Sequence, residues 1–177
     1  LPGQGAGRTV VDVGTGSGAV ALAVKKDRPR AEVTAMDLSR GALDTARRNA
    51  DSLDLEIQLL LGDLLKPLPP ELRPDLILSN PPYVSDGDYA SLAPEIRQWE
   101  PRGALTAGPD GLDIISRLAD QAASRLSPGG WLLTEIGMEQ GPATAAIFRD
   151  AGFEEIQVNK DLAQLDRVVM GRKAPTS

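Results

Sequence analysis

The sequence predicts a doubly wound α/β fold, in which helices cover both faces of a mostly parallel sheet. Short apolar runs alternate with helical patterns along the first half of the chain, and this alternation is typical of parallel strands joined by helices. Two further runs near the C-terminus, 155–158 and 167–170, are separated only by a loop. They predict a hairpin, and therefore one antiparallel strand in a sheet of seven.

The individual elements are predicted from apolar patterns and from residues that start or stop helices. The run from Thr9 to Val13 is continuous and rich in β-branched residues, as expected of a strand buried on both faces. Ser39 is a good N-cap for a helix that reaches about residue 50. Residues 80–111 have no clear period and are predicted to form a long loop, which in a compact domain is usually functional or disordered. The other expected strands are 32–37, 56–61, 75–79 and 131–136, and the other expected helices are 19–26, 112–126 and 140–151.

The composition excludes several kinds of chemistry. With 177 residues, 41% hydrophobic and 25% charged, the chain is expected to form one globular domain over residues 1–177. It contains no cysteine and no histidine, which excludes disulfides, thiolate or imidazole metal ligands, and a histidine general base. The net charge of −6 counts against a nucleic-acid partner. No apolar run approaches the ~20 residues of a membrane span, so we expect a cytoplasmic protein.

A glycine-rich segment, 12–19, lies where the first predicted strand meets the first predicted helix. Glycines there let the backbone turn sharply and approach a ligand, and the helix start offers free N–H groups. Gly14, Gly16 and Ala19 match the dinucleotide fingerprint. The same glycines with Gly18, preceded by Asp12, match equally well a loop that holds the methionine part of S-adenosylmethionine. The candidate ligand-binding residues of this loop are Gly14, Thr15, Gly16, Ser17 and Gly18.

Three polar side chains follow the ends of other predicted strands. Ligands of open α/β sheets bind outside the carboxyl ends of the strands, where Asp37, Asp63 and Asn80 all fall. Asp37 comes 19 residues after Gly18 and can accept hydrogen bonds from both ribose hydroxyls of either candidate ligand. Asp63, followed by Leu64, could accept a hydrogen bond from the amino group of adenine. Together with the glycine loop, these positions predict one nucleoside-containing ligand.

The tetrapeptide Asn80-Pro81-Pro82-Tyr83 has residue types that suit the chemistry of a planar nitrogen. The lone pair of an amide or aromatic amine is delocalised, so the nitrogen is a poor nucleophile. The side-chain oxygen of Asn80 and the carbonyl of Pro81 can accept its N–H groups and aim the lone pair at an electrophile. Pro82 stiffens the turn, and Tyr83 offers a face on which a planar group can stack. A nicotinamide dehydrogenase has no use for such a turn, so the dinucleotide interpretation becomes the weaker one.

With both motifs, the chain resembles the class I S-adenosylmethionine-dependent methyltransferases of the Asn-Pro-Pro-Tyr type. More narrowly, it resembles the protein glutamine-N5 methyltransferases that modify peptide chain release factors. The resemblance runs through essentially the whole chain. The stretches that carry it are 80–84, 100–105, 108–112, 129–130, 135–137 with Gln140, 161–163 and 166–169.

The resemblance implies a class I methyltransferase (Rossmann-like) fold that uses S-adenosylmethionine, yields S-adenosylhomocysteine and needs no metal. It implies that the substrate is the glutamine of a Gly-Gly-Gln loop in release factors, and that Glu100 and Glu135 shape the site or support it. Implied catalytic residues are Asn80, Pro81 and Tyr83, and implied substrate contacts are Asn80, Pro81, Pro82 and Tyr83. Implied cofactor contacts are Gly14, Thr15, Gly16, Ser17, Gly18, Asp37, Asp63, Leu64 and Asn80.

Two departures from the family pattern concern partner recognition and cofactor affinity. The family usually carries an N-terminal helical domain that grips the release factor, joined by an Arg-Pro-rich segment, and neither is present in this sequence. Because the chain begins at Leu1 rather than at a methionine, we expect an upstream portion. At the Leu64 position an aromatic residue can lie against adenine, whereas leucine would pack there without stacking.

Three other functions share part of the pattern. The tetrapeptide also occurs in adenine-N6 methyltransferases of DNA and RNA, which the acidic net charge disfavours. A close relative methylates a glutamine of a ribosomal protein, although the ending at 166–169 favours release factors. A non-catalytic module of the same fold would not need the intact tetrapeptide. Release factors are therefore the expected partner, with no membrane and no direct nucleic-acid partner.

Overall fold

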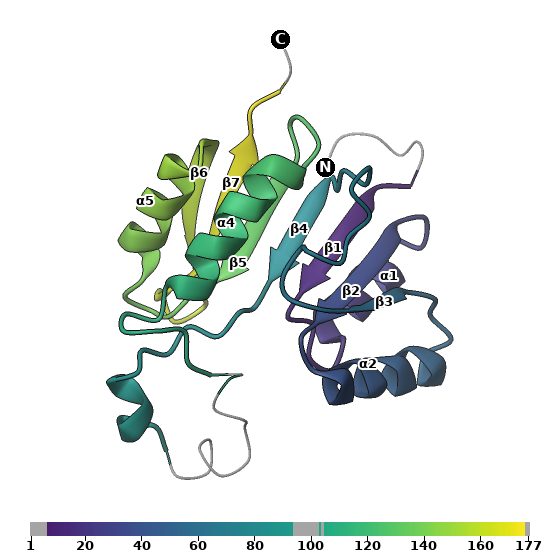
Figure 1. Ribbon diagram of the computed structural model, residues 1–177, viewed down its shortest axis with the longest axis horizontal. Helices are drawn as coiled ribbons and strands as arrows, with labels where there is room; N and C mark the ends of the chain where they lie inside the picture. The colour runs from purple at the N-terminus through teal and green to yellow at the C-terminus, as the bar shows by residue number, and fades with distance from the viewer. Residues whose placement is uncertain (1–6, 94–102, 104, 176–177) are drawn as a thin grey trace.

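The computed structural model describes residues 7–93, 103 and 105–175, and within these it has one seven-stranded sheet covered by helices (Figure 1). The strand order is β3-β2-β1-β4-β5-β7-β6. β1 to β5 are parallel, and β7 runs antiparallel to both of its neighbours, β5 and β6. The strands are β1 (Thr9–Val13), β2 (Glu32–Asp37), β3 (Gln58–Leu61), β4 (Leu76–Ser79), β5 (Trp131–Glu135), β6 (Phe153–Lys160) and β7 (Asp166–Lys173).

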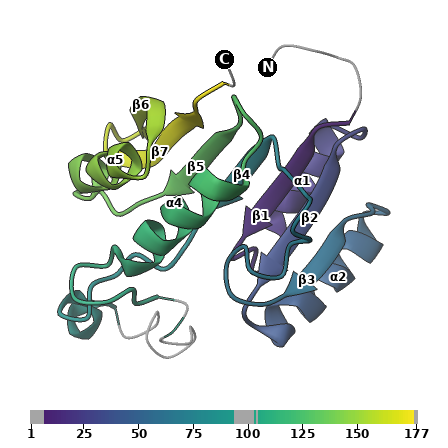
Figure 2. The same ribbon diagram turned by 45° about the horizontal axis from the view of Figure 1, so that its top comes forward.

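The helices pack on opposite faces of this sheet. α4 lies in front of it and α1 behind it in both views (Figures 1 and 2). The larger core joins α4 and α5 to the front face, where Ile115 and Phe148 pack with Ile77 of β4. A smaller core on the other face contains Ala21 of α1. The helices are α1 (Ala19–Asp27), α2 (Arg40–Ser52), the short 3-10 helix η1 (Asp88–Ser91), α4 (Asp113–Arg125) and α5 (Gly141–Asp150).

The predicted fold class is confirmed, including the single antiparallel strand, and most element boundaries agree within one or two residues. β2 has the predicted bounds, and Ser39 caps α2 by accepting a hydrogen bond from the Ala42 N–H at 3.3 Å. β3 is shorter than the predicted strand 56–61, because its pairing with β2 begins at Gln58. β6 is longer than the predicted strand 155–158. As an edge strand it has mostly exposed polar residues, which leave a short apolar pattern.

The predicted loop 80–111 contains more order than its sequence indicated. It holds η1, and its two ends pair with each other through an isolated parallel bridge between Val84 and Thr106. The N–H of Val84 donates to the carbonyl of Leu105 at 2.9 Å, and the N–H of Ala107 donates to the carbonyl of Val84 at 3.0 Å. The tetrapeptide is therefore followed at once by paired backbone rather than by irregular chain. The described residues include no helix that is long and apolar enough to span a membrane.

Parallel pairing places the candidate ligand-binding residues at one edge of the sheet. In the register of β1 with its neighbours, Val13 pairs with Met36 of β2 and with Ser79 of β4. The Ser79 hydroxyl also donates to the Val13 carbonyl at 2.8 Å, which ties the two strand ends together. The loops that follow β1, β2 and β4 consequently start side by side.

Candidate active site

The glycine loop is held in shape by backbone bonds to the end of β2. The N–H groups of Gly14 and Thr15 both donate to the Met36 carbonyl, at 2.8 and 3.0 Å. Gly14, Gly16 and Gly18 have φ angles of 71°, 55° and 83°, in the left-handed region that favours glycine. A β-carbon on Gly16 would meet no atom within 4 Å, so open space lies beside the loop, as a bound ligand requires.

The second half of the loop is fixed by the two helices beside it. A β-carbon on Gly18 would lie 3.1 Å from the β-carbon of Ala46, so glycine there lets the start of α1 approach α2 closely. The exposed Ser17 presents its carbonyl to the Asn49 amide of α2, which donates to it at 2.8 Å. All five candidate residues of the loop thus belong to one rigid turn between β1 and α1.

Asp12, near the end of β1 and just before the glycine loop, is a buried carboxylate that links β1 to α1 through hydrogen bonds. It is 1% exposed and accepts hydrogen bonds from the Thr15 hydroxyl at 2.6 Å and the Ala21 N–H at 3.2 Å. Burial raises the pKa of Asp12, although these two hydrogen bonds oppose the shift and the charge of Asp37 adds to it. Ionised Asp12 therefore costs more in the folded protein than in the unfolded chain.

This raised pKa leads to an expected pH dependence of stability. The folded protein binds the Asp12 proton more tightly than the unfolded chain, so stability is lost as pH rises from the ordinary aspartate pKa through the raised one. Asparagine does not ionise, so the Asp12→Asn variant should gain stability relative to wild type across that rise. Denaturant unfolding at pH values from acidic to neutral measures the difference. Asp44→Asn, on the exposed surface of α2, is the control. A constant difference between Asp12→Asn and wild type would contradict the expectation.

Asp37, at the end of β2, uses each carboxylate oxygen to hold a neighbouring loop. One oxygen accepts the N–H of Gly16 at 2.9 Å, and the other accepts the N–H of Ser39 at 2.8 Å. A carboxylate has about four acceptor positions, so it keeps the capacity to bind two ligand hydroxyls as well. Leu38 follows with its side chain 75% exposed, which gives an apolar surface beside the carboxylate. This combination fits a ribose joined to a flat ring.

Asp63 and Leu64 lie where the sequence placed them, just after β3, but Asp63 is already paired. Its Oδ2 atom accepts hydrogen bonds from Lys66 at 2.7 Å and from Arg117 of α4 at 2.5 Å. The hydrogen bond from Lys66 contributes most to lowering the pKa of Asp63. Leu64 has a φ of 51° and packs against the larger core. Because both cations contact Oδ2, the second oxygen, Oδ1, is the atom suited to accept an adenine amino group.

The tetrapeptide begins directly after β4 and lies beside the glycine loop. A β-carbon on Gly14 would be 3.7 Å from the carbonyl oxygen of Asn80, so the two motifs are adjacent. Asn80 is exposed, Pro81 is buried, and Pro82 and Tyr83 are half-buried. The turn therefore begins with a solvent-accessible residue, Asn80, which is followed by a buried proline, Pro81.

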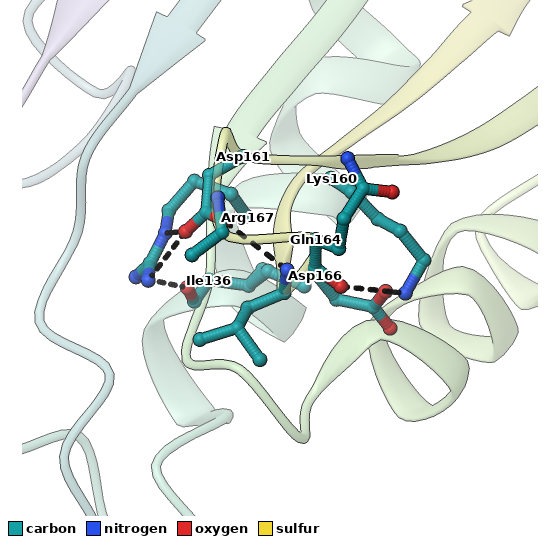
Figure 3. A network of polar contacts seen from close by, with 8 residues as sticks. Ile136, Lys160, Asp161, Gln164, Asp166 and Arg167 are labelled. Atoms are coloured by element: carbon teal, nitrogen blue, oxygen red, sulfur yellow. Dashed lines mark hydrogen bonds and ion pairs between the residues drawn. The ribbon is translucent and has the colours of Figure 1, made fainter.

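Arg167 of β7 was not among the residues predicted for the site. Its guanidinium donates to Asp161 Oδ2 through Nε and Nη2, at 3.2 and 3.1 Å, and to the Ile136 carbonyl at 3.4 Å (Figure 3). The hydrogen bond with Asp161 raises the pKa of Arg167, and the charges of Asp161 and Glu135 act in the same direction. Glu135 thus lies within electrostatic reach of the Arg167 guanidinium. Glu100 falls outside the described residues.

The geometry identifies further structural roles that sequence reasoning missed. Gln140 donates to the Tyr83 carbonyl at 2.9 Å, whereas from the sequence it was named only as part of the family resemblance, with no role in the site. The sequence offered one signal for this role, because Gln140 follows Gly137 by three residues and its side chain can reach back to that turn. Over the described part of the chain, no group of three or more histidines, cysteines or carboxylates could hold a metal ion.

The strand order, with a glycine loop after β1 and a carboxylate at the end of β2, defines the class I S-adenosylmethionine-dependent methyltransferase fold. Comparison with solved structures supports the same fold. The structure from Pyrococcus furiosus called a methyltransferase has a TM-score of 0.72 and 19% identity, over 96% of this chain and 76% of that one. The chain belongs to the methyltransferase small domain family, whose model matches residues 1–97.

Curated relatives indicate a more specific similarity within the methyltransferases. The release factor glutamine methyltransferase of Rhodopirellula baltica is 44% identical over 169 residues, which is 94% of this chain and 57% of the relative. That of Bordetella pertussis is 46% identical over 171 residues, which is 97% of this chain and 63% of the relative. The chain thus spans about three-fifths of the length of these relatives.

Proposed function

We propose that this chain transfers the methyl group of S-adenosylmethionine to the side-chain amide nitrogen of a protein glutamine. The substrate we propose is the Gly-Gly-Gln loop of a peptide chain release factor, which places the protein in the cytoplasm, with translation. The naming of relatives that are 44% and 46% identical supports this substrate.

The observation that carries the proposal is the place of the tetrapeptide, directly after β4 and beside the glycine loop. The bound cofactor would supply an electrophilic methyl on its sulfonium. The Asn80 side-chain oxygen and the Pro81 carbonyl would accept the two N–H groups of the glutamine amide, and the Tyr83 ring would hold its plane. The nitrogen gains the methyl and loses one proton to water, so no histidine is needed.

The residues we propose for the cofactor are those grouped at the carboxyl ends of β1 to β4. Gly14, Thr15, Gly16, Ser17 and Gly18 would surround the methionine part. Asp37 would bind the ribose hydroxyls, and Leu38 would lie against the adenine ring. Asp63 would accept the adenine amino group through Oδ1, with Leu64 beneath it and Asn80 near the reacting methyl.

Adenine methylation in nucleic acid is the second candidate, because an adenine amino group is also a planar nitrogen. The net charge of −6 works against it, since phosphate binding normally requires a basic surface. A ribosomal protein is the third candidate, because it also offers a glutamine amide. No contact among the described residues favours either of these candidates.

A labelling experiment separates these candidates. The protein is incubated with methyl-labelled S-adenosylmethionine and, in separate reactions, a release factor, a ribosomal protein fraction, RNA and DNA. We expect label in the release factor alone, lost when the glutamine of its Gly-Gly-Gln loop is replaced by alanine. Label only in nucleic acid would decide for adenine methylation, and label only in the ribosomal fraction would replace the proposed substrate.

A further inference from the structure

We infer that Gln140 is a positioning residue of the transfer reaction, which acts by holding the peptide group that follows Tyr83. The inference deepens the proposed function and rests on it for its activity readout. Gln140 is half-buried at the start of α5, whereas the candidate residues for transfer follow β4. Its effect on transfer would therefore pass through the Tyr83 backbone and not through the reacting atoms.

The side-chain amide of Gln140 joins three separate segments of the chain. Its Nε2 donates to the Tyr83 carbonyl at 2.9 Å and to the Asp110 carbonyl at 3.2 Å. Its Oε1 accepts the N–H of Gly137 at 2.9 Å. One amide group thus connects the tetrapeptide, the loop before α4 and the turn after β5. Only an amide, which donates and accepts at the same end of a side chain, can make all three bonds.

Gln140 is itself held firmly enough to position a neighbour. Its N–H donates to the Gly137 carbonyl at 3.0 Å, and its carbonyl accepts the Thr144 N–H at 2.9 Å as α5 begins. The backbone on both sides of the side chain is therefore bonded. Because the side chain starts from a fixed point and all its polar atoms are satisfied, it has little freedom to move.

Two glycines make room for this amide. Gly111 has a φ of 75°, and a β-carbon there would collide with the Tyr83 carbonyl oxygen and lie 2.8 Å from Gln140 Nε2. A β-carbon on Gly137 would lie 3.1 Å from Gln140 Oε1 and 3.6 Å from Cδ2 of the Tyr83 ring. The packing around the amide thus also touches the aromatic ring.

The consequence is that both sides of one peptide group are fixed. Gln140 holds the Tyr83 carbonyl, and the next N–H, that of Val84, donates to the Leu105 carbonyl at 2.9 Å. A peptide group bonded on both sides has one orientation, which fixes the backbone from which the Tyr83 ring projects. If the ring orients the substrate amide, loss of the Gln140 donor should lower the rate of methyl transfer. The affinity for S-adenosylmethionine should change much less.

The Gln140→Glu variant tests this, because glutamate keeps the size and can still accept the Gly137 N–H. At neutral pH it loses both donors and places a negative charge against two carbonyl oxygens. We expect kcat on the release factor to fall about 10- to 100-fold, the scale of lost buried hydrogen bonds with an added charge. The dissociation constant for S-adenosylmethionine should not change. Protonated glutamic acid regains one donor, so the rate relative to wild type should rise as pH falls. Gln157→Glu, exposed on β6, controls for the added charge.

Amide hydrogen exchange gives a readout that does not depend on activity. Segments 83–86 and 105–112 should exchange faster in Gln140→Glu than in wild type and in Gln157→Glu. If the wild-type protein leaves release factors unmethylated, the proposed function fails, while exchange still decides whether Gln140 holds Tyr83. Unchanged exchange, or a normal kcat, would overturn the inference, as would an equal loss of cofactor binding. If Gln140→Glu does not fold, Gln140→Met, which lacks donor and acceptor, takes its place with the same expected losses at every pH.

Discussion

Replacing Asn80 with alanine should lower the rate of methyl transfer ~100-fold or more, the scale of losing one oriented contact in a transition state. Asn80 is exposed, and no described residue forms a hydrogen bond with its side chain. The substitution therefore removes a group that is free to bind substrate, with little cost to the fold. Single-turnover transfer of labelled methyl to the release factor measures the loss, and calorimetry measures S-adenosylmethionine binding, which should weaken much less.

The matched control for this prediction is Asn159→Ala, at an exposed position of β6 away from the tetrapeptide. It should transfer methyl at the wild-type rate. Near-normal turnover in Asn80→Ala would refute the role of the amide in holding the substrate nitrogen. An equal loss of turnover and of cofactor affinity would instead make Asn80 a cofactor ligand only.

Replacing Asp37 with alanine should weaken S-adenosylmethionine binding about 10- to 100-fold, the scale of one or two hydrogen bonds to a charged group. The loss has two sources, because Asp37 also holds the N–H groups of Gly16 and Ser39. Asp37→Asn separates them, since asparagine keeps the shape and one accepting oxygen. We expect its dissociation constant to lie between those of wild type and Asp37→Ala.

Calorimetric titration with S-adenosylmethionine measures these constants. Asp44→Ala, which removes one exposed carboxylate from α2, should bind as wild type does and controls for the change in net charge. A dissociation constant that is the same in Asp37→Ala and in wild type would remove Asp37 from the ribose site. Turnover at saturating cofactor should be little changed in this variant, in contrast to Asn80→Ala.

The fold was largely predictable because its strands carry local signals. β1 and β2 are mostly apolar and buried, and glycine or proline lies near their ends. Their bounds could therefore be located from the local sequence pattern. The edge strand β6 was harder, since exposed Glu154, Glu155 and Gln157 interrupt its apolar pattern. A register shift between Glu154 and Gln157 disturbs the alternation further.

The predicted site residues share one edge because parallel strands bring their carboxyl ends together, which a sequence pattern can indicate. The contacts of Gln140 could not be predicted in the same way. Its partners are backbone carbonyls at Tyr83 and Asp110, and every residue has a carbonyl, so no residue type marks them. The bridge between Val84 and Thr106 was missed for a related reason, since two isolated residues leave no period.

The last strand of the chain is not the last strand of the sheet. β7 lies between β5 and β6, so β6 has no strand to pair with until residues 166–173 are present. α5 packs on both β6 and β7, and α5 begins next to Gln140. The glycine loop and Asp37 belong to strands that pair without β7, whereas α5, whose N-cap is Gln140, packs on the two strands that β7 completes. A chain truncated before β7 should therefore keep part of its proposed S-adenosylmethionine binding in calorimetric titration and lose transfer of methyl to the proposed substrate.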